Sequence, residues 1–293
     1  SKIKDMSIVD RDIFWSEYIR SGDDGFSKNI VESIYQHYKD GGKTTPRSVN
    51  GCLYASWVLT TTDRKLRDEA TRALYWAGRM DPALLYRLTK SSIEINDVYV
   101  PERLSAALYG VAMAAYGQRS EKWSKDFVAK LLPEIVTFIY EILTDPGKSN
   151  PIEHYLLRDY LIGILRVACL LSPGLLNEKQ LSSLDYPIST YKHKKWGEYN
   201  KEDDDPIGYP VHMDFEKYTL GGLISDRGNY DYDHDDYKKV VANIYWRIHD
   251  LGYRDKIFGD TDKQIANIPF YRRADNDKKI DRYGKKYSWI AYF

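Results

Sequence analysis

The sequence predicts an all-α protein, and two observations carry this prediction. Apolar residues recur at helical spacing in one segment after another through the first 180 residues. No segment there alternates apolar and polar residues between turn signals, as a half-buried strand would. The helices expected in this region cover 24–40, 47–61, 63–80, 99–116, 121–143 and 154–172.

Three of the helical stretches resemble one another. "DRKLRDEATRALYWAG" begins at Asp63, "DVYVPERLSAALYGVA" at Asp97 and "EHYLLRDYLIGILRVA" at Glu153. Each opens with an acid and places an aliphatic residue three positions later. The starts lie 34 and then 56 residues apart, and HEAT-like helix pairs repeat every ~40–47 residues. We therefore expect an α-solenoid of degenerate HEAT/TPR-like helix pairs, which would offer a concave surface to a partner.

The pattern changes after about residue 183. The following residues lack a helical stripe and are rich in aromatic side chains, so we expect an irregular insertion there; a long segment of this kind is usually functional or disordered. A helix returns at 235–250, and a polar, irregular stretch is expected at 252–280. The predicted organisation is a helical-repeat region at 1–183, the insertion at 184–234 and a further helical segment at 235–293.

Both ends of the sequence look cut. The chain opens on Ser1 without an apolar leader. At the other end a helical stripe runs to Phe293 with no Gly, Asn or Pro to end the helix. The stripe consists of Tyr283, Tyr287, Ile290 and Ala291. We therefore expect a fragment of a longer protein, truncated within its helical region.

Composition excludes several classes of function. Lys plus Arg and Asp plus Glu both number 43, so the net charge is zero, which argues against a dominant nucleic-acid surface. The best apolar run, "YLIGILRVACLL", contains Arg166 and falls short of the ~18 residues of a membrane helix. Cys52 and Cys169 both lie in apolar stretches, which favours free thiols of a cytoplasmic protein.

The stretch "GGKTT" at 41–45 resembles part of a phosphate-binding loop. The full motif requires a first glycine at the position of His37, and a strand before the loop. The preceding "IVESIYQHYKD" has a helical pattern instead. We therefore interpret these residues as a helix end and a turn before Pro46.

The acidic stretch "DYDHDDY" at 231–237 resembles a metal cage. Compared with a calcium loop, Asp236 stands where glycine is needed and Ala242 where glutamate is needed. We interpret the acids as the start of a helix, whose N-terminal dipole favours negative charge. A metal-dependent enzyme built on the 231–236 cluster remains an alternative.

No catalytic motif is present. The six histidines are scattered, without an HExxH pattern, and no G-x-S-x-G stretch occurs. The neighbouring opposite charges Glu102–Arg103 and Arg158–Asp159 are possible acid–base dyads. Ion pairs between neighbouring helices explain them better.

Several stretches together resemble one protein family. In order and number, "TTTDRKLRDEATRALYWAG", "DVYVPERLSAALYGVAMAA", "HYLLRDYLIGILRVAC" and "DRYGKKYSWIAYF" are similar to the C-terminal helical region of the Avs proteins, which are bacterial antiviral STAND NTPases. "RDIFWSEYI" near the start and "DFEKYTLGGLISD" at 214–226 fit the same region. The resemblance covers most of the chain except 184–210.

The resemblance implies a sensor. In that family an N-terminal effector, often a nuclease, precedes a central NTPase, and the C-terminal repeats sense a phage protein. The implied partner is the large terminase subunit or else the portal protein, met in the bacterial cytoplasm. The fragment itself would then be no enzyme and hold no cofactor, because ATP and Mg²⁺ belong to the NTPase part. Neither a membrane nor direct nucleic-acid binding is expected, and oligomerisation of the full protein on activation is plausible.

The residues expected to contact the partner lie in the insertion, because interface energy concentrates in a few Trp, Tyr and Arg anchors. The candidates are Tyr191, Lys194, Lys195, Trp196, Tyr199 and Tyr209. Two alternatives stay open for them: the aromatic residues pack the insertion onto the helices, or "YKHKKW" binds nucleic acid. For the whole chain, the alternative is a generic solenoid scaffold with no immune role.

Overall fold

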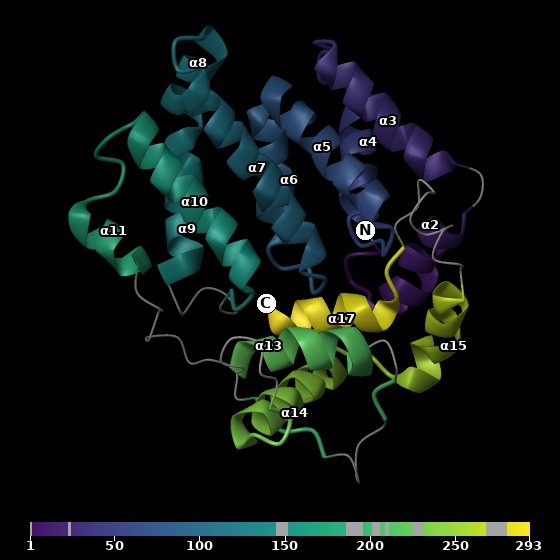
Figure 1. The fold of residues 1–293 in the computed structure, drawn as a ribbon. Helices are drawn as coiled ribbons and strands as arrows, with labels where there is room; N and C mark the ends of the chain where they lie inside the picture. The colour runs from purple at the N-terminus through teal and green to yellow at the C-terminus, as the bar shows by residue number, and fades with distance from the viewer. Residues whose placement is uncertain are drawn as a thin grey trace. The chain divides into compact units, whose positions relative to one another are not determined.

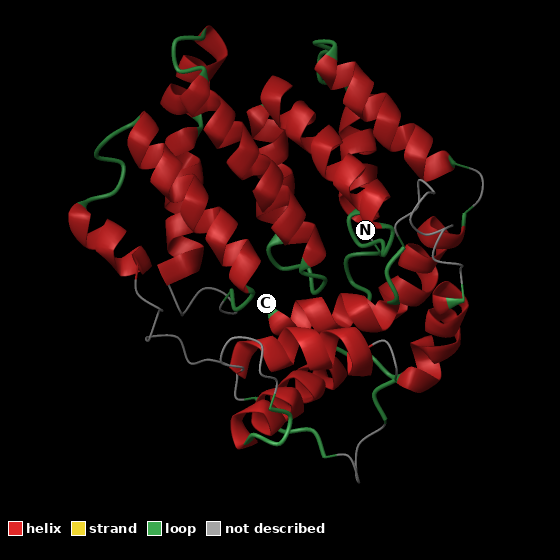
Figure 2. Cartoon of the chain, in the orientation of Figure 1, coloured by secondary structure: helices red, strands yellow, loops and turns green. Residues whose placement is uncertain are grey.

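The computed structural model is all-helical, which confirms the predicted fold class (Figures 1 and 2). It describes residues 2–22, 25–144, 152–185, 196–200, 206–208, 211–224, 231–267 and 280–293. Within these ranges there is no strand, and one isolated bridge pairs Asp63 with Ile280. No helix among them is long and apolar enough to span a membrane.

The chain forms two compact units. Unit 1 comprises Ser1–Ser21, Thr61–Leu66 and Lys194–Phe293, and unit 2 comprises Gly22–Thr60 and Arg67–His193. This division differs from the predicted one, because the first residues belong with the last hundred rather than with the helices that follow them. Each unit is described by itself below.

Unit 2 contains the helices from α3 to α11, although the first turn of α5 belongs to unit 1. Their bounds are α3 Phe26–Lys39, α4 Pro46–Val58, α5 Arg64–Met80, α6 Pro82–Ser92, α7 Tyr99–Gly117, α8 Lys122–Lys130, α9 Leu132–Thr144, α10 Tyr155–Leu171 and α11 Glu178–Asp185. Packing runs from one helix to the next: α3 on α4, α4 on α6 and α7, α6 on α7, α7 on α10, and α9 on α10. Figure 1 shows α5, α7 and α10, the helices of the three sequence repeats, following one another across the unit.

The acid that opens the first two repeats has a local role. Asp63 accepts a hydrogen bond from the backbone N–H of Leu66 at 3.1 Å, and Asp97 accepts one from Tyr99 at 3.2 Å. Such side chains satisfy backbone donors that have no partner in the first helical turn. In the third repeat His154, not Glu153, caps the helix. The repeated acid is therefore a helix-start signal.

A tyrosine shared by the first two repeats packs against a glycine of the next repeat. A Cβ added to Gly110 of α7 would come within 3.1 Å of the Tyr75 ring of α5. A Cβ added to Gly163 of α10 would come within 2.9 Å of the Tyr109 ring of α7. Tyr75 and Tyr109 hold the same position in the two aligned stretches. These contacts agree with stacked repeats, while the solenoid architecture itself remains a prediction.

The single helix predicted at 121–143 is wrong. The chain breaks at Leu131, with φ −121°, into α8 and α9. Pro133 explains the break, because its ring has no N–H and clashes with the carbonyl four residues earlier. It is tolerated within the first turn of α9, where backbone N–H groups have no helical partner. Among the described residues of unit 2, two further helices were not predicted, α6 after "MDP" and α11 at the edge of the expected insertion.

Unit 1 combines an N-terminal helical segment with the C-terminal helices. Its elements are α1 Ile8–Arg11, the π-helical η1 Asp12–Ser16, α2 Glu17–Ser21, the π-helical η2 His212–Leu220, α13 Gly221–Ile224, α14 Asp235–Asp250, α15 Asp255–Ala266 and α17 Tyr283–Tyr292. Helix α14 and the terminal helix were predicted. Residues 211–224 are helical although we expected irregular structure, and α15 lies in the stretch 252–280 that we also expected to be irregular.

Helix α17 is capped from another helix. Asp262 of α15 accepts hydrogen bonds from the backbone N–H groups of Tyr283 at 2.5 Å and Gly284 at 2.8 Å. The hydroxyl of Tyr253 donates to the same carboxyl group at 3.3 Å. Stacked and tilted rings of Phe258, Tyr283 and Tyr287 fill the space between α15 and α17. The start of α17 is thus fixed by tertiary contacts.

Candidate partner-binding surface

Of the six residues predicted to contact a partner, the structure places two. Tyr191, Lys194, Lys195 and Tyr209 lie outside the described residues. Trp196 and Tyr199 both lie against α14 in unit 1. The prediction that they anchor a partner therefore has to be weighed against a packing role.

Tyr199 is held by three contacts with α14. Its backbone N–H donates to the carbonyl of Ala242 at 3.0 Å, and its ring lies edge-on to Tyr245 and His249. Trp196 is held less firmly: its ring centroid lies 6.4 Å from that of Trp246, and 36% of the residue is exposed. The contacts of Tyr199 agree with the packing alternative, whereas Trp196 still presents ring surface to solvent.

The "GGKTT" stretch is a helix end and a turn, as interpreted. Gly41 has φ 82°, in the left-handed region that glycine adopts readily. The N–H of Gly42 donates to the carbonyl of His37 at 2.8 Å, a common way to close an α-helix. Thr45 then caps α4, with Pro46 as its first residue.

The acidic stretch at 231–237 leads into α14. His234 is the N-cap residue, and Asp235 and Asp236 occupy the first turn, where the helix dipole favours negative charge. No group of three or more His, Cys, Asp or Glu side chains suited to a metal ion occurs within the described part of the chain. The start of this helix is therefore where the sequence placed it.

The charge pair in the second repeat connects neighbouring helices. Arg103 Nη1 of α7 lies 2.7 Å from Asp68 Oδ1 of α5. Glu102 is buried, and burial raises the pKa of its carboxyl group. Nε2 of the buried His154 lies 3.9 Å from Glu102 Oε2. The helix-to-helix ion pair expected for Arg103 is thus present.

Sequence reasoning missed a surface of aromatic and cationic side chains in unit 2. We call it the Arg–Tyr surface. It consists of Tyr35 and Lys39 of α3, Arg72, Tyr75 and Arg79 of α5, Tyr109 of α7, Trp123 of α8 and Tyr160 of α10. All of these residues are exposed or half-buried.

Side-chain contacts make the Arg–Tyr surface continuous from helix to helix. The guanidinium of Arg72 lies 4.2 Å from the centre of the Tyr35 ring, and Lys39 Nζ lies 5.1 Å from the same ring. Tyr75 packs on α7, and the Tyr109 ring lies 6.2 Å from that of Tyr160. The surface therefore crosses successive helices without depending on a loop.

Arg79 is the most firmly held cation of this surface. Its guanidinium lies 4.3 Å from the Trp123 ring centre and donates to Gln118 Oε1 at 2.8 Å and to the Tyr75 hydroxyl at 3.3 Å. The indole N–H of Trp123 donates a hydrogen bond to the same Gln118 Oε1 at 3.0 Å. An arginine placed in this way needs little ordering when it binds an anion.

A regular spacing along α5 could have revealed part of this surface. Asp68, Arg72, Tyr75 and Arg79 follow one another at i, i+4, i+7 and i+11, which places them on one face of the helix. Another face of α5 carries its buried apolar residues, among them Ala70, Ala73, Leu74 and Ala77. The sequence signal for this part of the surface was one tyrosine and two arginines on the face of α5 opposite its buried residues.

No family model, curated protein or solved structure matches the chain. The fold itself defines an all-helical protein with an aromatic and cationic surface on α3, α5, α7, α8 and α10.

Proposed function

We propose that the chain is a protein-recognition module. It acts as the sensor part of a bacterial anti-phage STAND NTPase and binds a phage packaging protein, the large terminase subunit or else the portal. An effector elsewhere in the full protein then responds. The module works by binding in the cytoplasm and performs no chemistry of its own.

The observation that supports binding is the Arg–Tyr surface. Tyrosine, tryptophan and arginine are the residues that most often carry the energy of protein interfaces. Here such side chains lie exposed or half-buried on α3, α5, α7, α8 and α10, and several of them contact one another. Rigid anchors bind with a smaller loss of side-chain entropy. The resemblance to the Avs sensor region supplies the identity of the partner.

The proposal is tested by titrating the purified chain with a purified large terminase subunit and, separately, with a portal protein. One of the two is expected to bind, and Tyr75→Ala and Tyr109→Ala are each expected to weaken binding by about 2 kcal/mol, or roughly thirtyfold. Tyr18→Ala is the matched control, because Tyr18 of α2 is 53% exposed and lies outside the Arg–Tyr surface.

Melting curves of every variant separate lost binding from lost folding. Failure of the folded chain to bind either packaging protein would refute the sensor role. Binding that Tyr75→Ala and Tyr109→Ala leave unchanged would keep the sensor role and remove the Arg–Tyr surface from it. Scaffold function without an immune role predicts the first of these outcomes.

A further inference from the structure

Within the described part of the chain, three cations of the Arg–Tyr surface have no acidic partner. Among the described residues, no carboxylate lies within ion-pair distance of Lys39, Arg72 or Arg79. Asp68, one turn before Arg72 on α5, is engaged with Arg103 at 2.7 Å. Lys39 and Arg72 even lie against the same ring, that of Tyr35. Like charges gathered in this way repel one another, and no neighbouring carboxylate among the described residues offsets that repulsion.

The hydrogen bonds of Arg79 leave donors for a ligand. A guanidinium carries five N–H groups, four of them on its two terminal nitrogens. Arg79 uses one terminal N–H for Tyr75 and one for Gln118, and its Nε is buried without a hydrogen-bond partner. Two terminal N–H groups remain, on a plane already fixed against Trp123. This arrangement suits a carboxylate, which takes two parallel hydrogen bonds from a guanidinium.

The spacing of the cations defines the size of the ligand. Arg72 and Arg79 are seven residues apart on α5, which corresponds to ~10 Å along the helix axis. Tyr75 lies between them on the same face. A ligand that meets both arginines must carry negative charges about this far apart and can place an apolar group on the tyrosine.

We propose that Lys39, Arg72 and Arg79 bind an acidic segment of a protein partner, with Tyr75 contacting an apolar side chain between its carboxylates. This inference deepens the proposed function, because it names the chemistry of the recognised segment. Charge complementarity supports it: three uncompensated cations meet the carboxylates of the partner, and such pairing mainly raises specificity and the association rate.

A nucleic acid fits these observations less well. Its affinity grows with the number of phosphates that the protein neutralises, and three cations give only a small electrostatic contribution at physiological salt. The zero net charge of the chain supplies no long-range attraction.

The test uses the full chain and three probes at low salt. The first is a rhodamine-labelled peptide that alternates pairs of glutamates with leucines, the second has glutamine in place of every glutamate, and the third is oligothymidine. The acidic peptide is expected to bind saturably, and the glutamine peptide and oligothymidine at least about tenfold more weakly. Equal binding of the two peptides, or tighter binding of oligothymidine, would overturn the inference.

Variants locate the binding to the three cations. Arg72→Gln with Arg79→Gln should weaken acidic-peptide binding about a hundredfold, since the charged hydrogen bond lost with each arginine accounts for about tenfold. Arg87→Gln is the matched control, an exposed arginine of α6 that lies outside the Arg–Tyr surface. If the double variant melts early, Lys39→Gln with Arg72→Gln replaces it, because both of those residues are exposed. Unchanged affinity in a folded double variant would refute the proposal.

Its failure can be distinguished from failure of the proposed function. If the acidic peptide binds as expected but neither packaging protein does, the sensor role fails and the acidic-segment inference stands. If a packaging protein binds equally well to the chain and to the folded Arg72→Gln/Arg79→Gln variant, the inference fails and the sensor role stands.

Discussion

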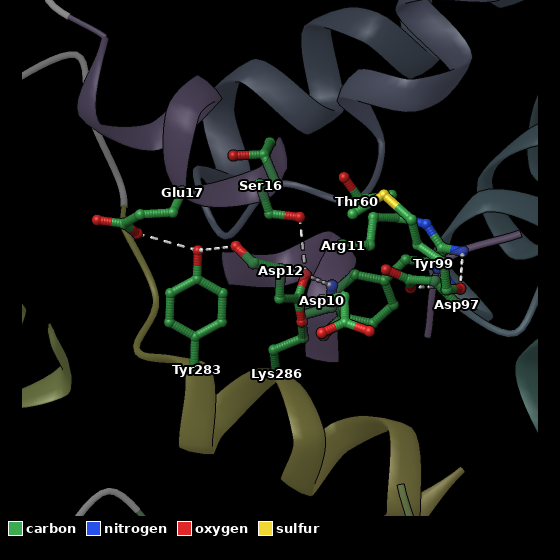
Figure 3. A network of polar contacts seen from close by, with 12 residues as sticks. Asp10, Arg11, Asp12, Ser16, Glu17, Thr60, Asp97, Tyr99, Tyr283 and Lys286 are labelled. Atoms are coloured by element: carbon green, nitrogen blue, oxygen red, sulfur yellow. Dashed lines mark hydrogen bonds and ion pairs between the residues drawn. The ribbon is translucent and has the colours of Figure 1, made fainter. Parts of the chain in front are cut away.

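Lys286 of α17 and Asp12 of η1 form a buried ion pair within unit 1. Lysine Nζ lies 2.7 Å from Asp12 Oδ1, and the two side chains are 1% and 0% exposed. Figure 3 shows Lys286 pointing from its helix to the Asp12 carboxylate. The same carboxylate accepts a hydrogen bond from the Ser16 hydroxyl at 2.7 Å. One turn earlier, the Tyr283 hydroxyl reaches Glu17 Oε2 at 3.0 Å. The N-terminal segment and α17 are therefore joined by polar groups inside the unit.

Removing one member of this pair should strongly destabilise unit 1. Lys286→Met leaves the buried Asp12 carboxylate without its cation, and breaking a buried ion pair costs about 3–5 kcal/mol. The free energy of unfolding, measured by urea denaturation, is expected to fall by that amount.

Lys285→Met is the matched control for this variant. Lys285 is 37% exposed and lies 3.3 Å from Asp281, so its loss should change stability by no more than about 1 kcal/mol. A Lys286→Met variant as stable as Lys285→Met would contradict the assigned role of the buried pair.

Asp262 gives the stability of unit 1 a dependence on pH. Burial raises the pKa of its carboxyl group from 3.8 to about 6, although the N–H groups of Gly284 and Tyr283 oppose the shift. The folded state then binds the proton more tightly than the unfolded state, so this contribution is fully present below pH 3.8 and is lost as the pH rises through 6. Between pH 4.5 and 7 the loss amounts to about 2 kcal/mol.

The measurement compares the chain with Asp262→Asn across this pH range. Asparagine cannot titrate, so the stability advantage of the unmodified chain over the variant should shrink by about 2 kcal/mol from pH 4.5 to 7. Asp260→Asn serves as the control, since the Asp260 side chain is 94% exposed. A constant difference between the chain and Asp262→Asn over this range would show that Asp262 does not titrate there.

Gly78 marks a close approach between helices in unit 2. A Cβ at this buried position of α5 would lie 2.3 Å from Leu85 Cδ2 and 3.0 Å from Val111 Cγ2. Gly78→Ala should therefore lower the free energy of unfolding by about 1–3 kcal/mol, despite the better helix propensity of alanine. Gly117→Ala has no atom within 4 Å of the new Cβ and should leave stability unchanged or raise it slightly. Thermal melting compares the stability of the two variants. Equal melting temperatures would show that the helices around Gly78 can move apart to make room for the added Cβ.

The predicted anchor role of Trp196 has a direct test. Because 36% of the residue is exposed, its ring is able to meet a partner while it also lies near Trp246. As an anchor, Trp196→Ala should weaken partner binding by about 2 kcal/mol with little change in melting temperature. The opposite pattern, a lower melting temperature with unchanged affinity, would assign the ring to packing on α14.

Helices with a clear apolar stripe were predictable, and those with a weaker local signal were not. α5, α10 and α14 combine a stripe with a capping residue, so local sequence specified both their type and their approximate start. α15 was missed because Asp255, Asp260, Asp262 and Lys263 hide its stripe, and Asp262 is buried only through tertiary contacts.

The two-unit organisation and the candidate surface were beyond the reach of local patterns. Nothing near Asp12 in the sequence indicates that its partner is Lys286. The cations of the Arg–Tyr surface were individually visible, but their pairing with rings on α3 and α8 depends on how the helices pack. The sequence pointed instead to the aromatic insertion, where clustered tyrosines were conspicuous along the chain.

The pairing of Asp12 with Lys286 in unit 1 has a consequence for protein synthesis. Asp12 leaves the ribosome 274 residues before Lys286, a delay of roughly 15–55 s at typical rates of synthesis. Unit 2 is encoded almost entirely between them and has mostly local helix contacts, so it can fold while the chain is still growing. The Asp12 carboxylate therefore lacks its cation until translation passes residue 286. A chain released before that point contains Asp12 without the lysine that pairs with it in unit 1.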